Sequence, residues 1–113
     1  MSIRKPQRTA MTENAKNPDA CMTMLDVRAG VDETDSQLIT LLEKRFAYMR
    51  AAARIKSERN AVRDEVRKST VIKNAEQAAE KAGIPSDAIA EIWDRLVESS
   101  IEYEMQHWDS LRD

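Results

Sequence analysis

The sequence has 113 residues, 42% of them hydrophobic and 34% charged, which suffices for one modest hydrophobic core. Its 18 Lys and Arg residues and 20 Asp and Glu residues are scattered along the chain and leave a formal net charge of -2. This balance excludes the basic, aromatic-rich surface that nucleic-acid-binding domains carry. No run of about 18 apolar residues and no secretory signal sequence occurs, so no membrane partner is expected.

Cys21 is the only cysteine of the chain, and His107 is the only histidine. A single thiol cannot form an internal disulfide, and neither residue belongs to a Cys/His pattern with zinc-ligand spacing. We therefore expect a protein of the reducing cytoplasm that has no metal site.

The first 20 residues differ from the rest of the chain. They contain four basic residues and two prolines and almost no large apolar side chain. Such a segment cannot offset its ordering entropy by burying apolar surface. The sequence predicts a disordered leader over residues 1–20, followed by a helical domain over residues 21–113.

Beyond residue 20 the chain has the composition of an all-α protein. Ala, Leu, Glu, Lys and Arg dominate, glycine and proline are scarce, and no run alternates between apolar and polar residues as a strand would. Three helices are expected, over residues 23–57, 64–82 and 86–111, with a polar connection at 57–63.

Local signals set the expected helix ends. Thr23 opens the sequence "TMLD", which offers a hydroxyl cap and an acid three residues later. Asp64 is the expected N-cap of the second helix, Gly83 can end it in the left-handed conformation, and Pro85 prevents its continuation. Ser86 is then expected to cap the third helix.

The length of the first helix predicts a partner. About 34 residues at ~1.5 Å each span roughly 50 Å, which is more than one small domain can cover. A second copy of the chain, related by a two-fold axis, is the simplest way to bury the far end. The expected assembly is an intertwined helical homodimer.

Three cations fall on the otherwise apolar heptad columns of this helix, namely Arg28, Arg45 and Lys56. A lone buried cation costs several kcal/mol, so anions are expected to meet these side chains. The anions could be acids within the bundle, or the side chains could extend to solvent at the helix ends. Because inward-facing acids are few, a small dianionic ligand is the other interpretation.

The spacing of these cations indicates how they could share one ligand. Arg45 and Lys56 lie roughly 16 Å apart along a helix axis, which two long side chains can bridge around a small dianion. Arg28 lies roughly 25 Å from Arg45 and is too far to join them within one straight helix. In an antiparallel dimer, however, Arg28 of one chain would approach the Arg45 to Lys56 segment of its partner.

The third helix supplies the remaining polar candidates. Ser100 and Glu104 share its inward face, although Ser100 could be a small packing residue and Glu104 could simply pair with Lys56. Arg67, in the first turn of the second helix, could face either the bundle or solvent. Three further residues of this helix are expected to pack rather than to act, namely Trp93, His107 and Trp108.

Three stretches carry a resemblance to a known family: "CMTMLDVRAGVDETDSQLITLLEKR", "YMRAAARIKSE" and "VRDEVR". They resemble the all-helical (type II) class of chorismate mutases, and within it the sub-group that includes the bacterial isochorismate pyruvate lyases. The resemblance covers residues 18 to about 108.

The resemblance implies roles for the same cations. Arg28 would come from the partner chain, and Arg45 and Arg67 would join it in holding the two carboxylates of a small dicarboxylate substrate, chorismate or isochorismate. Lys56 would bind the ether oxygen and a carboxylate. Lys56, Arg45 and Glu104 would be the catalytic residues.

The resemblance also implies contacts to the substrate ring, with two departures from the family pattern. Asp64 would contact the ring hydroxyl, and Ser100 would contact the ring carboxylate. Glu104 stands where many members have glutamine, so it must be protonated to donate to the ether oxygen, and we expect activity to fall as pH rises. Lys68 stands where mutases often have a glutamate that faces the ring hydroxyl, which leaves the substrate isomer open.

The activity implied is a chorismate mutase, an isomerase of aromatic amino-acid biosynthesis in the shikimate pathway that needs no cofactor. An isochorismate pyruvate lyase, which forms salicylate and pyruvate, is the alternative within the same family. A helical dimerisation or regulatory module without enzymatic activity is the alternative outside it.

Overall fold

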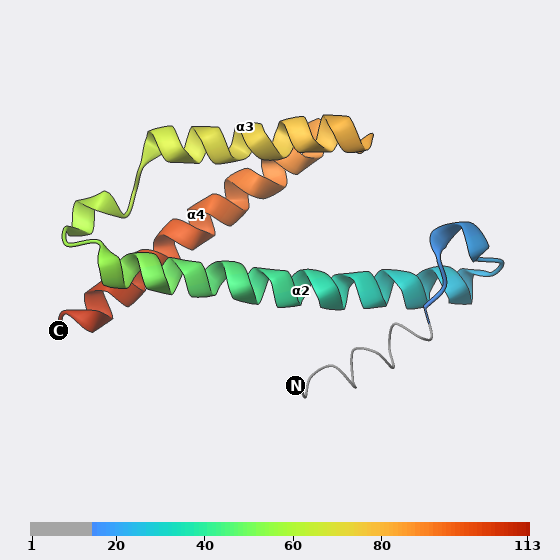
Figure 1. The fold of residues 1–113 in the computed structure, drawn as a ribbon, viewed down its shortest axis with the longest axis horizontal. Coiled ribbons are helices and arrows are strands. Elements are labelled where there is room, and N and C mark those ends of the chain that lie inside the picture. The colour runs from blue at the N-terminus through green and yellow to red at the C-terminus, as the bar shows by residue number, and fades with distance from the viewer. Residues whose placement is uncertain (1–14) are drawn as a thin grey trace. The chain divides into compact units, whose positions relative to one another are not determined.

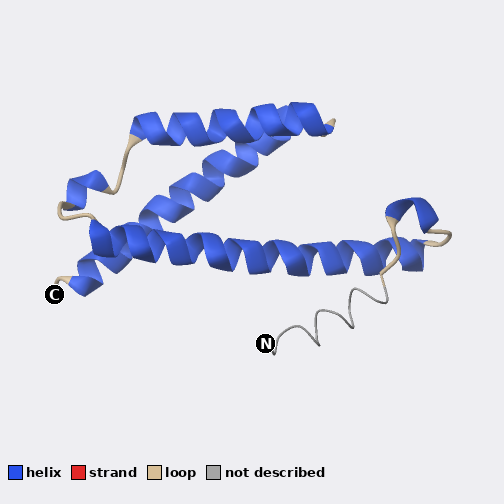
Figure 2. Cartoon of the chain, in the orientation of Figure 1, coloured by secondary structure: helices blue, strands red, loops and turns tan. Residues whose placement is uncertain are grey.

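The computed structural model describes residues 15–113, and all regular structure in this part of the chain is helical (Figures 1 and 2). Its elements are the 3-10 helix η1 (Pro18–Ala20), α2 (Met24–Ile55), the 3-10 helix η2 (Arg59–Ala61), α3 (Glu65–Ala82) and α4 (Ser86–Leu111). The predicted all-α class with three helices, the first of them the longest, is confirmed. None of the described helices combines the length and the apolar character needed to cross a membrane.

The start of α2 carries the predicted hydroxyl cap. Thr23 Oγ1 accepts a hydrogen bond from the Asp26 N–H at 3.2 Å. The Asp26 carboxylate accepts from the Met22 N–H at 3.0 Å and lies 3.3 Å from Lys16 Nζ. The hydrogen bond from Met22 is the main reason that the pKa of Asp26 lies below its usual value. Sequence signals therefore located this helix start correctly.

Both ends of α3 also follow the prediction. Asp64 is the N-cap, and its Oδ1 accepts from the Arg67 N–H at 3.0 Å. At the other end Gly83 adopts a left-handed conformation, with φ of 74°. The Ile84 N–H then reaches back to the Ala79 carbonyl at 3.0 Å, and the Gly83 N–H donates to the Glu80 carbonyl at 3.1 Å, so carbonyls of the last turn have donors beyond the helix end.

The predicted cap of α4 is wrong by one residue. Pro85 occupies the N-cap position, and Ser86 is the first helical residue and makes no capping hydrogen bond. The Pro85 carbonyl already accepts from the Ile89 N–H at 3.1 Å, so the helical hydrogen bonds begin one residue earlier than expected. Proline suits this place because it has no N–H that needs a partner.

By its contacts the chain divides into two compact units, one up to Lys44 and one over Arg45–Asp113, so α2 contributes to both. The first unit holds η1 and the first part of α2. Residues 1–14 of the predicted leader lie outside the described residues, and Pro18–Ala20 at its end forms a 3-10 turn. The domain predicted for residues 21–113 stays a prediction.

The second unit contains the packing that positions the candidate site. α3 and α4 pack against each other, and the end of α2 joins α4 through an edge-to-face contact of Phe46 with Tyr103, whose ring centroids are 5.0 Å apart. The buried apolar residues of this unit are small: Ala53, Val62, Ala79 and Val97. Small side chains let the helices approach closely and leave the larger polar residues at the edge of a pocket.

Candidate active site

The second unit has a pocket of about 380 Å³, with walls from the end of α2, the following connection, α3 and α4. This volume falls within the range of small-molecule sites, roughly 300–1,000 Å³. Six of the seven residues predicted for the site line it: Arg45, Lys56, Asp64, Arg67, Ser100 and Glu104. The seventh, Arg28, lies in the first unit and is exposed.

Arg45 is held in the pocket wall by α4. Its Nη1 donates to Ser100 Oγ at 2.7 Å, and the Ser100 hydroxyl in turn donates to the Leu96 carbonyl at 2.7 Å. Ser100 is buried and therefore acts as a fixed acceptor for the guanidinium rather than as a mere packing residue. Burial lowers the pKa of Arg45, and the nearby charge of Arg67 lowers it further.

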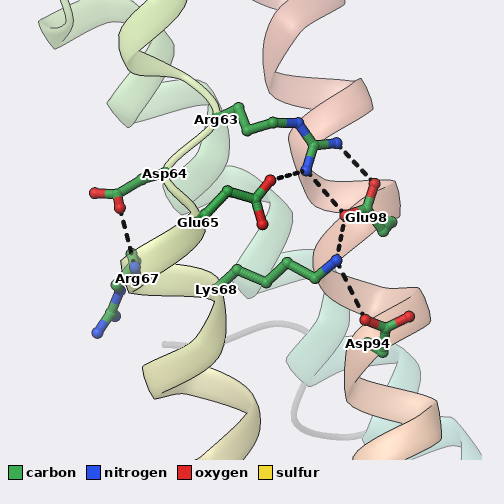
Figure 3. A network of polar contacts seen from close by, with 7 residues as sticks. All are labelled: Arg63, Asp64, Glu65, Arg67, Lys68, Asp94 and Glu98. Atoms are coloured by element: carbon green, nitrogen blue, oxygen red, sulfur yellow. Dashed lines mark hydrogen bonds and ion pairs between the residues drawn. The ribbon is translucent and has the colours of Figure 1, made fainter.

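Arg67 joins Arg45 at the pocket. Its N–H is bound by the capping carboxylate of Asp64, while its guanidinium extends away from Glu98 (Figure 3). No ion pair joins either Arg45 or Arg67 to an acid within the part of the chain that the structure describes. The site therefore presents two guanidinium groups that repel each other and favour an anion between them.

Lys56 and Glu104 form an ion pair at the same pocket. Lys56 Nζ lies 2.9 Å from Glu104 Oε2, and the side chain of Glu104 is 5% exposed. The approach is close, but its angle is not that of a hydrogen bond, so this buried oxygen has an ionic partner without a well-aligned donor. The internal pair that the sequence left open is thus the arrangement observed.

A network of charges between α3 and α4 borders the pocket, and sequence analysis missed it (Figure 3). Lys68, which lines the pocket, lies 2.6 Å from Glu98 Oε2 and 3.2 Å from Asp94 Oδ1. Arg63 donates to both oxygens of Glu98, at 2.8 Å and 3.1 Å. Two acids four residues apart on a helix were the available signal, but their partners depend on how α3 packs on α4.

Glu98 is the centre of this network. Its two cationic partners, Arg63 first and Lys68 second, lower its pKa to about 2 from a usual 4.5. Because the carboxylate joins the residues before α3 to α4, it holds the connection that forms one wall of the pocket. The ionised form is therefore the form that supports the wall.

We expect Glu98→Gln to lower the melting temperature at pH 7. A depressed folded pKa contributes stability that is complete above the unfolded value, near 4.5, and is lost as pH falls through about 2. The difference between wild type and variant should therefore shrink over that interval, as measured by thermal unfolding at several pH values. Glu102→Gln is the matched control, because Glu102 is exposed on the same helix and makes no ion pair with another described residue. A Glu98→Gln melting temperature equal to that of wild type at pH 7 would contradict this role.

Across residues 15–113, no group of three or more His, Cys, Asp or Glu side chains is arranged to hold a metal ion. The chemical character of the site is set instead by cations around one buried carboxylate. Such a site can bind a small dianion and place positive charge beside an oxygen atom.

Comparisons with known proteins agree with this character. The sequence model of the family described as chorismate mutase type II matches residues 27–105, which is more than half of the chain. The isochorismate pyruvate lyase of Pseudomonas aeruginosa is 23% identical over 97 residues, which cover 86% of this chain and 96% of that protein. The predicted resemblance is confirmed, and the chain belongs to the type II chorismate mutase family.

Proposed function

We propose that this protein is a cofactor-free isomerase that converts chorismate to prephenate by a Claisen rearrangement, in the cytoplasmic pathway to aromatic amino acids. The observation that carries the proposal is the pair of guanidinium groups, of Arg45 and Arg67, that face one pocket and form no ion pair with an acid among residues 15–113. Chorismate brings two carboxylates. It therefore supplies the charge that this pocket lacks.

The proposed catalysis begins with conformational restraint. The rearrangement is unimolecular and needs the enolpyruvyl side chain to lie over the ring, so fixing both carboxylates lowers the entropic part of the barrier. Arg45 and Arg67 are the proposed carboxylate ligands from this chain. Ser100 would contact the ring carboxylate, and Asp64, at the start of α3, would contact the ring hydroxyl.

Electrostatic stabilisation is the second proposed contribution. Negative charge develops on the ether oxygen as its bond to the ring breaks, and a preorganised cation beside that oxygen stabilises the transition state more than the ground state. Lys56 is the proposed cation. Glu104, which lies 2.9 Å from Lys56 Nζ, would donate a second hydrogen bond to the ether oxygen once it carries a proton.

We also propose that two chains share each site. Large apolar side chains are exposed along α2, with Ile39 66% and Leu41 62% exposed, which is the pattern of a face that a partner covers. The others in the first part of α2 are Met24, Leu25, Val27, Val31 and Leu38. Arg28 lies on the same stretch of helix, so a partner chain that covers this face would bring its own Arg28 to the dicarboxylate.

A complementation experiment tests the shared site. Arg28→Ala and Lys56→Ala homodimers should each be nearly inactive, yet a mixture allowed to exchange subunits should recover activity. A heterodimer has one site with both residues intact, so random exchange restores about a quarter of the native sites. Mixing Lys56→Ala with a second portion of the same variant is the control. Absence of recovery, with dimers confirmed by analytical ultracentrifugation, would contradict the shared site.

The alternative activity is an isochorismate pyruvate lyase, which the similarity to the Pseudomonas aeruginosa protein favours. Arg45 and Arg67 would hold the two carboxylates of isochorismate in the same way. The ether bond would then break with release of pyruvate and salicylate. Each purified substrate should be offered to the protein in turn. Prephenate from chorismate supports the mutase proposal, whereas salicylate and pyruvate from isochorismate, with chorismate left unchanged, would replace it with the lyase.

A further inference from the structure

The C-terminal end of α2 is held by the last turn of α4. α2 ends at Ile55, and the carbonyls of a last helical turn have no N–H donor further along their own helix. Trp108 Nε1 donates to the Lys56 carbonyl at 3.0 Å, and Arg112 Nη2 donates to the same oxygen at 2.8 Å. Arg112 Nη1 donates to the carbonyl of the buried residue Ala53 at 3.1 Å.

The Arg112 guanidinium is well placed for this task. Arg112 Cζ lies 4.1 Å from the ring centroid of Trp108, so a cation–π contact holds the two donor side chains together. The planar fork of the guanidinium spans two carbonyls at once, which a single ammonium cannot do. Its positive charge also lies at the negative end of the α2 dipole.

These contacts fix the main chain of Lys56 on both sides. Its N–H donates to the Ala52 carbonyl at 2.9 Å, and its own carbonyl receives the donors from α4. The position of the end of a long flexible side chain is defined only when its own main chain is held in place. The anchor therefore determines where Lys56 Nζ, 2.9 Å from Glu104, can reach into the pocket.

We infer that Arg112 and Trp108 are positioning residues that fix Lys56 for catalysis, an inference that rests on the proposed function. Neither residue lines the pocket, and both lie beyond the residues 27–105 that match the family. They act on the reaction only through the backbone of Lys56. The residues that position Lys56 therefore lie in the C-terminal segment after residue 105, outside the family match.

A neighbouring ion pair supplies a matched control. Arg59, in η2, donates to both carboxylate oxygens of Asp109, at 2.8 Å and 3.0 Å. This pair also joins the connection after α2 to the end of α4, yet it makes no hydrogen bond to Lys56. Arg59→Gln therefore removes a similar surface contact and leaves the anchor in place.

Steady-state kinetics with the active substrate form the first arm of the test. Arg112→Ala should lower kcat by about 10-fold to 100-fold with KM within about twofold, the loss expected when a catalytic group is displaced by about 1 Å. Arg112→Lys should recover part of kcat because it keeps the charge and one donor. Arg59→Gln should match wild type. If Arg112→Ala does not fold, Trp108→Phe carries the same test, because it removes the indole donor and keeps an aromatic ring.

A double variant separates positioning from a general structural role. If Arg112 acts through Lys56, adding Arg112→Ala to Lys56→Ala should leave kcat at the level of Lys56→Ala alone. Independent effects would multiply instead. A kcat for the double variant that is lower by the full Arg112→Ala factor would overturn the inference, as would an Arg112→Ala kcat equal to that of wild type.

Amide hydrogen exchange forms the second arm and does not depend on activity. Exchange in the segment 53–57 should be faster in Arg112→Ala than in wild type, because the carbonyls of the last turn of α2 lose the guanidinium donors, and unchanged in Arg59→Gln. Equal exchange in wild type and Arg112→Ala would overturn the inference. Inactivity of the wild-type protein towards both chorismate and isochorismate would instead overturn the proposed function, so the two failures are distinguishable.

Discussion

Lys56→Ala should lower kcat by a factor of about 10² to 10³ and change KM by only a few fold, since one preorganised charge at a developing anion has an effect of this size. In the proposed mechanism Lys56 faces charge that appears only as the ether bond breaks. An interaction made in the transition state, and not in the ground state, is lost from kcat and from kcat/KM together. Initial rates with chorismate over a range of concentrations separate the two constants.

Two further variants control for the ion pair of Lys56 with Glu104. Removing the ammonium leaves the nearly buried carboxylate of Glu104 without its cation, which also lowers stability. Lys56→Ala/Glu104→Gln removes that unpaired charge and should unfold at a higher temperature than Lys56→Ala while kcat stays low. Lys56→Arg keeps a positive charge and should retain more activity than Lys56→Ala. An effect of Lys56→Ala confined to KM would contradict the proposed role.

Glu104→Gln should change the pH dependence of the reaction from a falling profile to a flat one. An ionised carboxylate would repel the ether oxygen, so in the proposed mechanism Glu104 acts as the protonated acid, and the activity of the wild-type protein should fall as pH rises. The decline approaches about tenfold per pH unit once the proton is lost. An amide has no proton to lose and donates at every pH. The variant should therefore exceed wild type by the largest factor in the alkaline range.

The surroundings of Glu104 differ between the free protein and the proposed complex. In the free protein Lys56 Nζ lies 2.9 Å from its carboxylate, and a bound substrate would add two carboxylates to the same pocket. Measuring kcat/KM and kcat from about pH 5 to pH 9 compares the free protein with the complex. A wild-type profile that is flat from acid to neutral pH would remove Glu104 from the mechanism.

Lys68 shows how tertiary contacts assign a residue that sequence leaves open. It stands where the family pattern often has a glutamate that faces the ring hydroxyl, which left that contact open, and it does line the pocket. Its ammonium, however, is bound to Glu98 and Asp94 of α4, and these acids raise its pKa. A cation engaged in this way supports the pocket wall. In the proposed complex, therefore, Asp64 rather than Lys68 is expected to contact the ring hydroxyl.

The sequence by itself determined the local features of this protein. The helix start at Thr23, the cap at Asp64 and the turn at Gly83 each depend on hydrogen bonds between residues at most five positions apart, and short-range patterns specify such bonds. Helical periodicity likewise identified Arg45 and Lys56 as cations on an apolar stripe, because that reading depends only on the repeat of the helix. The family motifs then added Arg67.

Only the tertiary structure decided which charges meet. Arg45 binds Ser100 across 55 positions of sequence, Lys56 pairs with Glu104, and Arg112 reaches the Lys56 carbonyl across 56 positions. Contacts at such separation depend on the crossing of helices and on their rotation about their own axes, which no local pattern encodes. Trp108 therefore looked like a packing residue in the sequence. In the folded chain it is a hydrogen-bond donor at the end of α2.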